Sequence, residues 1–281
     1  MRADLHVHSN ASDGTDSPAQ VIRRAAQAGL DVVALTDHDT VAGHEQARRA
    51  LPDGLILVPG MELSGRLQGR SVHLLAYLFD AGDAELNAEL ARIRDDRVLR
   101  ARAMVSRLAE LGVDVSWDQV AAIAGPAVVG RPHIARAMAA SGAIAEPREA
   151  FTRDWIADGG RAYVDRYALD PGHAIRLVRA AGGAVVLAHP RAGRDWETSD
   201  EQIAGLAAVG LAGVEVFHPD QTDAERARLL ALTNDLGLLA SGGSDDHGGL
   251  TGYRIGCELA AADVYQGLIS ITTGARPLRR N

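Results

Sequence analysis

Short apolar stretches alternate with amphipathic stretches along most of the chain. Seven apolar stretches are four to seven residues long and several are rich in β-branched side chains; they cover residues 4–8, 31–36, 55–58, 72–78, 183–188, 213–217 and 238–241. Continuous apolar runs of this length are typical of strands buried on both faces of a parallel sheet. Because the segments between them have the pattern of helices, we predict an α/β protein whose seven strands form a barrel or a barrel-like sheet.

The predicted helices have recognisable beginnings. Ser17-Pro18 and Asp170-Pro171 each combine a helix-capping residue with a proline suited to the first turn. Ser199 and Thr222 each begin a capping-box pattern, with a Gln or Glu three residues later. These signals predict helices that begin directly after residues 17, 170, 199 and 222.

Residues 81–165 interrupt the alternation of strands and helices. This interval has helical patterns near 84–111, 116–124, 131–141 and 147–157, and none that is typical of a strand. We therefore predict an all-helical insertion domain at 81–165 within a barrel formed by residues 1–80 and 166–281. The arginines of 84–111 alternate with acidic residues, which favours a solvated helix face over a nucleic-acid-binding patch.

Composition and charge exclude several classes of protein. The 281 residues are 47% hydrophobic and carry a net charge of −8, which argues against an extended DNA-binding surface. No run approaches the ~20 apolar residues of a membrane helix, and the amino terminus has no apolar signal core, so we expect a cytoplasmic protein. All 29 basic residues are arginine, which excludes a P-loop lysine, a Schiff-base lysine or a carbamylated lysine between metals. A single cysteine excludes internal disulfides and a cysteine-based zinc site.

The ten histidines are the strongest chemical signal in the sequence. His6 and His8 lie two residues apart on the first predicted strand, so their side chains point the same way. Six of the seven strands carry a histidine that we expect at the carboxyl-terminal rim of the sheet, and the remaining strand carries Glu62. Besides His6 and His8, the histidines expected at this rim are His38, His73, His189, His218 and His247. Active sites of α/β folds and barrels are built at this rim.

This rim of imidazoles and carboxylates predicts a metal centre. A lone strand histidine is more often a hydrogen-bonded core residue, but seven strands that all deliver such a group are hard to explain in that way. Burying these groups together without a cation would leave polar atoms unsatisfied. Neutral imidazole and carboxylate are ligands that Zn, Mn and Fe accept.

The segments around these residues resemble the polymerase-and-histidinol-phosphatase (PHP) family of metal-dependent phosphoesterases. The motifs that carry the resemblance are Asp4-Leu5-His6-Val7-His8-Ser9 with Ser12-Asp13-Gly14, Thr36-Asp37-His38-Asp39, Gly60-Met61-Glu62, Ala188-His189-Pro190 and Gly243-Ser244-Asp245-Asp246-His247. The chain is most similar to the stand-alone bacterial branch with a helical insertion, whose members act on nucleoside 3′,5′-bisphosphates and short RNA 5′ ends. Gly130-Arg131-Pro132-His133 in the insertion fits that branch. The fold implied is a distorted seven-stranded (β/α) barrel.

The resemblance also implies a cluster of two to three divalent metals, with Mn favoured over Fe or Zn. Its ligand pattern assigns His6, His8, Glu62 and Asp245 to the first metal, Asp13, His38 and His247 to the second, and Glu62 as a bridge with His73 and His189 to the third. The reaction expected is hydrolysis of a phosphate ester by a hydroxide that bridges two metals.

Further residues are candidates for proton transfer and substrate binding. His218, which the ligand pattern does not use, is the candidate general acid, and Asp37 is a weaker one. Arg131, His133 and Arg191 are candidates for binding a second phosphate, with the insertion acting as a lid. The expected partner is therefore a small phosphorylated nucleotide or a short RNA, and no oligomeric state is favoured.

Four alternatives remain open at this point. The metal site suits a 5′-3′ exoribonuclease or a histidinol-phosphate-type phosphatase equally well. An amidohydrolase also begins with His-x-His on a barrel strand, although its common binuclear form uses a carbamylated lysine that this chain lacks. A metal-stabilised binding module is disfavoured, since a structural site needs only about four ligands.

Overall fold

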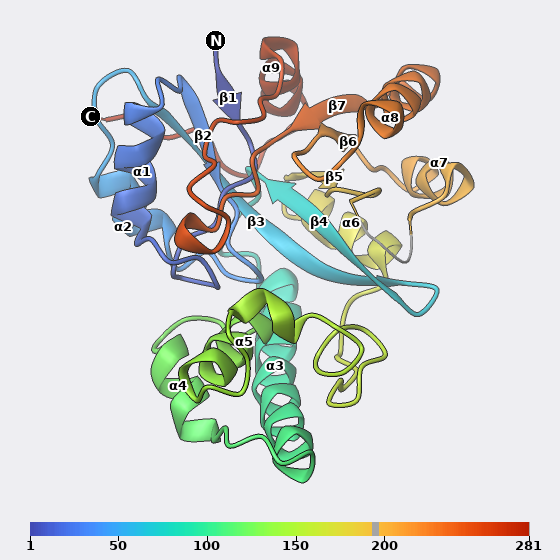
Figure 1. The fold of residues 1–281 in the computed structure, drawn as a ribbon. Helices are drawn as coiled ribbons and strands as arrows, with labels where there is room; N and C mark the ends of the chain where they lie inside the picture. Colours follow the sequence, from blue (N-terminus) through green and yellow to red (C-terminus); the bar gives the residue numbers. More distant parts are fainter. Residues whose placement is uncertain (193–196, 281) are drawn as a thin grey trace. The chain divides into compact units, whose positions relative to one another are not determined.

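The computed structural model describes residues 1–192 and 197–280 (Figure 1). The first half contains β1 (Ala3–Asp4), α1 (Pro18–Gln27), β2 (Val32–Leu35), α2 (His44–Arg49), β3 (Ile56–Leu67), β4 (Arg70–Tyr77), α3 (Ala84–Glu110), α4 (Trp117–Ala124), α5 (Arg131–Ala140) and the 3-10 helix η1 (Pro147–Ala150). The second half contains α6 (Pro171–Ala180), β5 (Ala184–Leu187), α7 (Asp200–Ala208), β6 (Gly213–Phe217), α8 (Asp223–Leu236), β7 (Leu239–Gly242), the 3-10 helix η2 (Gly248–Leu250) and α9 (Ala262–Ile271).

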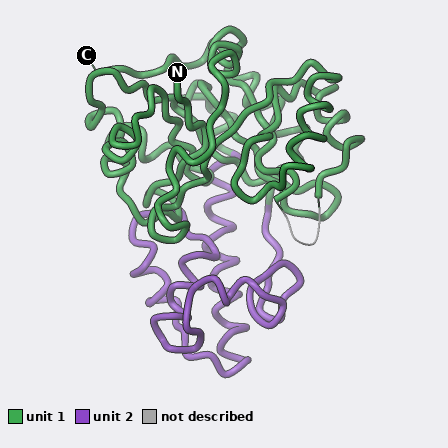
Figure 2. The backbone as a smooth tube through the Cα atoms, turned by 45° about the horizontal axis from the view of Figure 1, so that its top comes forward, with its two compact units in different colours: residues 1–88, 168–281 green, residues 89–167 purple. Residues whose placement is uncertain are grey.

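The chain divides into two compact units (Figure 2). Unit 1 comprises Met1–Ala88 and Ala168–Asn281, and unit 2 comprises Glu89–Tyr167. Unit 2 contains helices and no strand, and all of its residues are described. It has an apolar core of its own, which includes Met104, Leu108 and Ile134. The lid function of the insertion stays a prediction.

The seven strands of unit 1 lie in sequence order and form a nearly closed barrel. A bridge from Ala3 to Ala260 and a hydrogen bond from Leu5 N to Gly242 O, 3.3 Å long, connect the first strand to the segments that follow β7. The predicted (β/α) barrel is therefore confirmed. Among the described residues, no helix is long and apolar enough to cross a bilayer.

The apolar runs are typical of strands in a parallel sheet, but β4 departs from that arrangement. The pairs β1–β2, β2–β3, β5–β6 and β6–β7 are parallel, whereas β4 is antiparallel to both β3 and β5. The cause is a two-residue turn, Gln68-Gly69, in which both residues have positive φ (48° and 81°) and which sends the chain directly back. This hairpin makes β3 twelve residues long, so it extends well past the end of β2.

The helix ends agree with the capping patterns. Ser17, Ser199 and Thr222 each accept a backbone hydrogen bond at the start of a helix, and each takes part in a capping box. Ser116 caps α4 in the same way. On the strands, apolar side chains such as Val32 pack with residues of α9 into one core cluster. This core supports the loops that follow the strands.

Candidate metal centre

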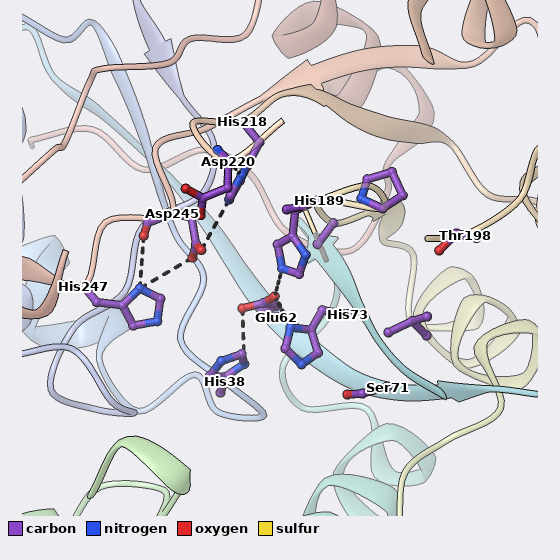
Figure 3. A pocket seen from close by; sticks show the side chains of 14 residues that line it. His38, Glu62, Ser71, His73, His189, Thr198, His218, Asp220, Asp245 and His247 are labelled. Atoms are coloured by element: carbon purple, nitrogen blue, oxygen red, sulfur yellow. Dashed lines mark hydrogen bonds and ion pairs between the residues drawn. The ribbon is translucent and has the colours of Figure 1, made fainter. Parts of the chain in front are cut away.

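The side chains predicted as metal ligands meet at one end of the barrel, where those labelled in Figure 3 point toward one another. Eight of the nine form three groups in which all ligand atoms lie within 4.8 Å: His6, His8, Glu62 and Asp245; His8, Asp13, His38 and His247; and His38, Glu62 and His73. The ninth, His189, has its Nε2 atom 3.1 Å from Glu62 Oε1. The structure thus brings all nine side chains into one cluster.

The strand arrangement explains how residues so far apart in sequence reach the same rim. His6, His38 and His189 follow the parallel strands β1, β2 and β5. Glu62 lies inside β3, because β3 continues beyond the end of β2. His73 lies near the start of β4, not at a carboxyl-terminal strand end as predicted. It reaches the rim because β4 runs antiparallel to its neighbours.

The first group has the spacing of atoms that share an ion. The Nε2 atoms of His6 and His8 are 3.0 Å apart, and Glu62 Oε2 lies 3.3 and 3.0 Å from them. Asp245 Oδ1 lies 3.3 Å from each of the two Nε2 atoms. Ligand atoms at about 2.0–2.2 Å from one ion are separated by roughly 3.0–3.5 Å. The four side chains therefore fit a single divalent ion.

The second group is centred on Asp13, in the loop after β1. Its Oδ1 lies 3.3 Å from His247 Nε2, and its Oδ2 lies 3.7 Å from His38 Nε2. Nδ1 of His8 is 3.8 Å from Asp13 Oδ1. Nδ1 of His8 and Nδ1 of His38 are buried and have no hydrogen-bond partner. Such atoms are costly to bury, and a metal would satisfy them.

The carboxylate of Glu62 joins the groups. Its Oε1 lies 2.8 Å from His73 Nδ1 and 3.1 Å from His189 Nε2. Its Oε2 lies near the Nε2 atoms of His6 and His8 and 3.2 Å from His38 Nδ1. The Glu62 side chain is 1% exposed. Each oxygen of this buried carboxylate therefore faces a different set of imidazoles. The donor set of imidazoles and carboxylates, without thiolates, fits Mn, Fe or Zn.

The carboxylates also shift the pKa values of the histidines between them. Burial lowers the pKa of His6, but the surrounding carboxylates outweigh this and hold it well above its usual value. At His8, Asp245 and Glu62 outweigh burial and raise the pKa to about 10. At His38, burial dominates and lowers the pKa to about 3. Without a metal, protons on His6 and His8 would supply positive charge to this cluster at neutral pH.

Comparisons with known proteins support this interpretation of the cluster. The family model for the PHP domain matches residues 4–90. A 5′-3′ exoribonuclease of Haemophilus influenzae is 34% identical over 246 residues, which cover 87% of this chain and 89% of that protein. The chain belongs to the PHP domain family.

Other PHP relatives carry different names. A phosphoribosyl 1,2-cyclic phosphate 1,2-diphosphodiesterase of Eggerthella lenta is 33% identical, with 88% of this chain and 95% of that protein covered. A 3′,5′-nucleoside bisphosphate phosphatase of Chromobacterium violaceum is 33% identical, with coverage of 87% and 86%. A solved structure from Bifidobacterium adolescentis, assigned as a metal-dependent phosphoesterase, has a TM-score of 0.89, 33% identity and 96% coverage of both chains. This PHP chain is a metal-dependent phosphoric ester hydrolase.

Glu215 is a buried carboxylate that contacts two of the proposed metal ligands and was not found from the sequence. Glu215, on β6, accepts a hydrogen bond from the backbone N of His189 (2.8 Å), and its Oε1 lies 3.0 Å from His6 Nδ1. A second carboxylate behind a metal-binding histidine fixes the ring orientation and the tautomer. The sequence does hold a signal for this role, because Glu215 is an acidic residue between two valines in a strand predicted to be buried.

The loop after β7 has an unusual backbone at the PHP cluster. Asp245 has φ of 48°, in the left-handed region that non-glycine residues seldom adopt. Gly243 lies so close to His6 that a Cβ atom at this position would be 2.4 Å from the His6 Cβ. The glycine therefore permits the close approach that brings Asp245 to the histidines of the first strand.

The predicted general acid, His218, lies at a cavity of about 390 Å³ whose lining includes six of the proposed ligands. Its Nδ1 accepts a hydrogen bond from the backbone N of Asp220 (3.1 Å), and its Nε2 lies 3.4 Å from Asp245 Oδ2 (Figure 3). Because Nδ1 is an acceptor, a neutral His218 carries its proton on Nε2.

Asp37, the weaker candidate acid, is placed differently. Its carboxylate accepts hydrogen bonds from the backbone N and Oγ of Ser9 and from Oγ of Ser12, at 2.7–2.8 Å. It is buried and does not line the cavity. These bonds hold the loop that carries Asp13, so the geometry favours a structural role.

The three predicted phosphate-binding residues are also outside the cavity lining. Arg191 is buried and forms an ion pair with Asp200. His133 and Arg131 belong to unit 2, where the Nδ1 of His133 accepts a hydrogen bond from Gly130 N (3.0 Å) at the start of α5. A phosphate-binding role for these residues stays a prediction.

Arg254 is a cation beside the PHP cluster that sequence reasoning did not find. Its Nη2 donates a hydrogen bond to the Asp245 backbone carbonyl (3.2 Å) and lies 3.6 Å from Asp245 Oδ2. Its Nη1 lies 3.7 Å from Asp220 Oδ1. An arginine in an irregular loop offers no pattern that would reveal these contacts.

Metal binding at pH 7 is expected to release protons. The raised pKa of His8, about 10, keeps its imidazole protonated in the metal-free protein, whereas a metal ligand must be deprotonated. About one proton or more should therefore leave each chain. Calorimetric titration of metal-free protein with Mn²⁺, in two buffers with different heats of ionisation, counts these protons. The number should fall as the pH rises toward 10, and a buffer-independent heat at pH 7 would contradict the prediction.

Proposed function

We propose that this chain removes a phosphate from a nucleoside 3′,5′-bisphosphate, using two to three divalent metals held by the cluster around Glu62. The observation that carries the proposal is the cavity of about 390 Å³ over three ligand groups that share this one buried carboxylate. A small nucleotide suits a cavity of this size. The name of the Chromobacterium violaceum relative supports this choice of substrate.

The proposed ligands of the metals are the side chains that the structure groups together. They are His6, His8, Glu62 and Asp245 for one ion, Asp13, His38 and His247 for another, and Glu62, His73 and His189 for a third. When bound, the metals would lower the pKa of water and offset the negative charge of the phosphoryl oxygens. Manganese suits this mixed set of nitrogen and oxygen donors.

We assign His218 the role of proton donor to the leaving alkoxide oxygen. The backbone N–H of Asp220 holds His218 Nδ1 as an acceptor, so the proton of the neutral ring is on Nε2. Nε2 also faces Asp245 Oδ2, at 3.4 Å. Asp37 cannot take this role easily, because its oxygens already accept three hydrogen bonds. We place the reaction in the cytoplasm, where its nucleotide substrates occur.

A second candidate substrate is the 5′ end of a short RNA. The specific observation that favours it is the Haemophilus influenzae relative, which is named as an exoribonuclease and covers most of this chain. Both substrates present a phosphate ester to the same metals, so the metal cluster alone does not distinguish them. Turnover of the nucleoside bisphosphate and of the short RNA, measured side by side, distinguishes the two functions.

The function is tested by single turnover in ¹⁸O-labelled water. The Mn²⁺-loaded enzyme should release phosphate from adenosine 3′,5′-bisphosphate, with one ¹⁸O atom in the first phosphate formed, because the oxygen of water attacks phosphorus and the bond from phosphorus to the leaving alkoxide oxygen breaks. Mass spectrometry measures the label. Unlabelled phosphate in the first turnover would contradict the mechanism. Faster hydrolysis of N-acyl or cyclic amide substrates than of any phosphoester would instead favour an amidohydrolase.

Replacing His218 by Asn should reduce turnover in a manner that depends on the leaving group. The kcat for adenosine 3′,5′-bisphosphate should fall about 100-fold, because its alkoxide leaves only with a proton. The kcat for p-nitrophenyl phosphate should fall far less, because p-nitrophenolate leaves unprotonated near neutral pH. Steady-state kinetics with both substrates measure the two effects.

The matched control is His173→Asn, a substitution of a histidine on α6 that lies outside the cavity lining. It should leave both kcat values unchanged. Equal losses on both substrates for His218→Asn would show that His218 orients Asp245 and is not the proton donor.

A further inference from the structure

Asp220 is an exposed carboxylate in the lining of the cavity at the metal cluster. It lies in the loop after β6, two residues after His218, and its backbone N donates a hydrogen bond to His218 Nδ1 (3.1 Å). Both side chains line the same cavity (Figure 3). The Asp220 side chain is 58% exposed, and within residues 1–192 and 197–280 its carboxylate accepts no hydrogen bond. Its oxygens are therefore available to a ligand.

Neither a metal nor the stability of the fold explains this carboxylate. Among the described residues, Asp220 belongs to none of the groups whose ligand atoms lie within 4.8 Å of one another. Its contact with Arg254 joins Oδ1 to Nη1 over 3.7 Å, which is too long for a hydrogen bond. An exposed ion pair of this kind adds little to stability. The position of Asp220 in the cavity thus favours a contact with the substrate.

The negative charge of Asp220 restricts what it can bind. A phosphate ester is an anion, and like charges at short range repel each other. A carboxylate in this cavity therefore disfavours a phosphoryl group beside it and favours a neutral hydrogen-bond donor. Ionised aspartate is an acceptor only, and acidic side chains in nucleotide-binding folds accept hydrogen bonds from ribose hydroxyl groups. A sugar hydroxyl group is the part of a nucleotide that suits Asp220 best.

The neighbouring His218 indicates which hydroxyl group this is. In the proposed function, His218 Nε2 gives its proton to the leaving oxygen, so the alcohol part of the substrate lies on the His218 side of the cavity. Asp220 lines the cavity on the same side. When a ribose 3′ oxygen leaves phosphorus, the 2′-hydroxyl group is on the adjacent carbon atom. Nucleoside 3′,5′-bisphosphates and RNA both contain this arrangement.

We propose that the carboxylate of Asp220 accepts a hydrogen bond from the hydroxyl group next to the leaving oxygen, and so selects ribonucleotide over 2′-deoxyribonucleotide substrates. The proposal rests on the proposed function, because it uses the role of His218. All the residues involved belong to unit 1. Because Asp220 is exposed, water can take the place of a missing hydroxyl group, so the contribution should be about tenfold and not an absolute exclusion.

Kinetics with two substrates and two enzymes test the selection. The substrates are adenosine 3′,5′-bisphosphate and its 2′-deoxy analogue, and the variant is Asp220→Ala. The ratio of kcat/KM for the two substrates should be about tenfold smaller in the variant than in the native enzyme. The 2′-hydroxyl group also changes the intrinsic reactivity of the ester. The change in the ratio between the enzymes, and not the ratio itself, therefore measures the contact.

The matched control is Asp223→Ala, since Asp223 is an exposed aspartate at the start of α8 and outside the cavity lining. This control should leave the ratio unchanged. Equal losses on both substrates for Asp220→Ala would mean that Asp220 only positions Arg254, and would overturn the proposal. Elemental analysis of Asp220→Ala should give the native metal content. A loss of metal would show that Asp220 acts through Asp245, and would also overturn the proposal.

Two small esters separate this proposal from the proposed function. Glycerol 2-phosphate has hydroxyl groups on the carbon atoms next to its ester carbon, and isopropyl phosphate has the same skeleton without them. Asp220→Ala should also reduce the preference for glycerol 2-phosphate over isopropyl phosphate. If it does so while neither bisphosphate is hydrolysed, the proposed function fails and the Asp220 contact stands. If the bisphosphates are hydrolysed and neither ratio changes, the contact fails and the function stands.

Discussion

The two oxygens of Glu62 hold the cluster together. Oε1 contacts His73 and His189, whereas Oε2 contacts histidines from the first two strands. One buried carboxylate thus links groups carried by β4 and β5 to groups that follow β1 and β2. Because each oxygen faces a different set of imidazoles, the side chain can serve two ions only if its position is fixed. The extension of β3 beyond β2 fixes it.

The distortion of the barrel brings the imidazoles to both oxygens of Glu62. The turn at Gln68-Gly69 reverses the chain, so β4 runs antiparallel and its early residue His73 lies beside Glu62. Around the rim, Gly243 permits the loop after β7 to touch the first strand, and the left-handed backbone of Asp245 turns its carboxylate toward the histidines. Strain at a functional residue persists only where its surroundings determine it fully. Here the hydrogen bond from Asp245 N to the His6 carbonyl (2.8 Å) is part of those surroundings.

Much of this architecture could be predicted from local signals in the sequence. The His-x-His pair, the capping boxes and the apolar strand runs each depend on residues close together in the chain. The antiparallel β4 could not be found from apolar runs alone, since the run at 72–78 has no direction; the short turn before it was the missing signal. Glu215 and Arg254 were missed because their roles arise from contacts between distant segments. An aspartate is suited to acid catalysis, but the carboxylate of Asp37 accepts hydrogen bonds from Ser9, which favours a structural role in holding the loop after β1.

The metal content of Glu62→Gln tests most directly the claim that Glu62 joins the cluster. An amide keeps one oxygen donor and replaces the other by a group that cannot bind a metal. The three ligand groups predict about three ions per chain in the native protein. Glu62 belongs to two of these groups and is absent from the group of His8, Asp13, His38 and His247. Elemental analysis of metal-replete Glu62→Gln should therefore give about one ion per chain, with His73→Asn losing about one ion only. Native metal content in Glu62→Gln would contradict the account.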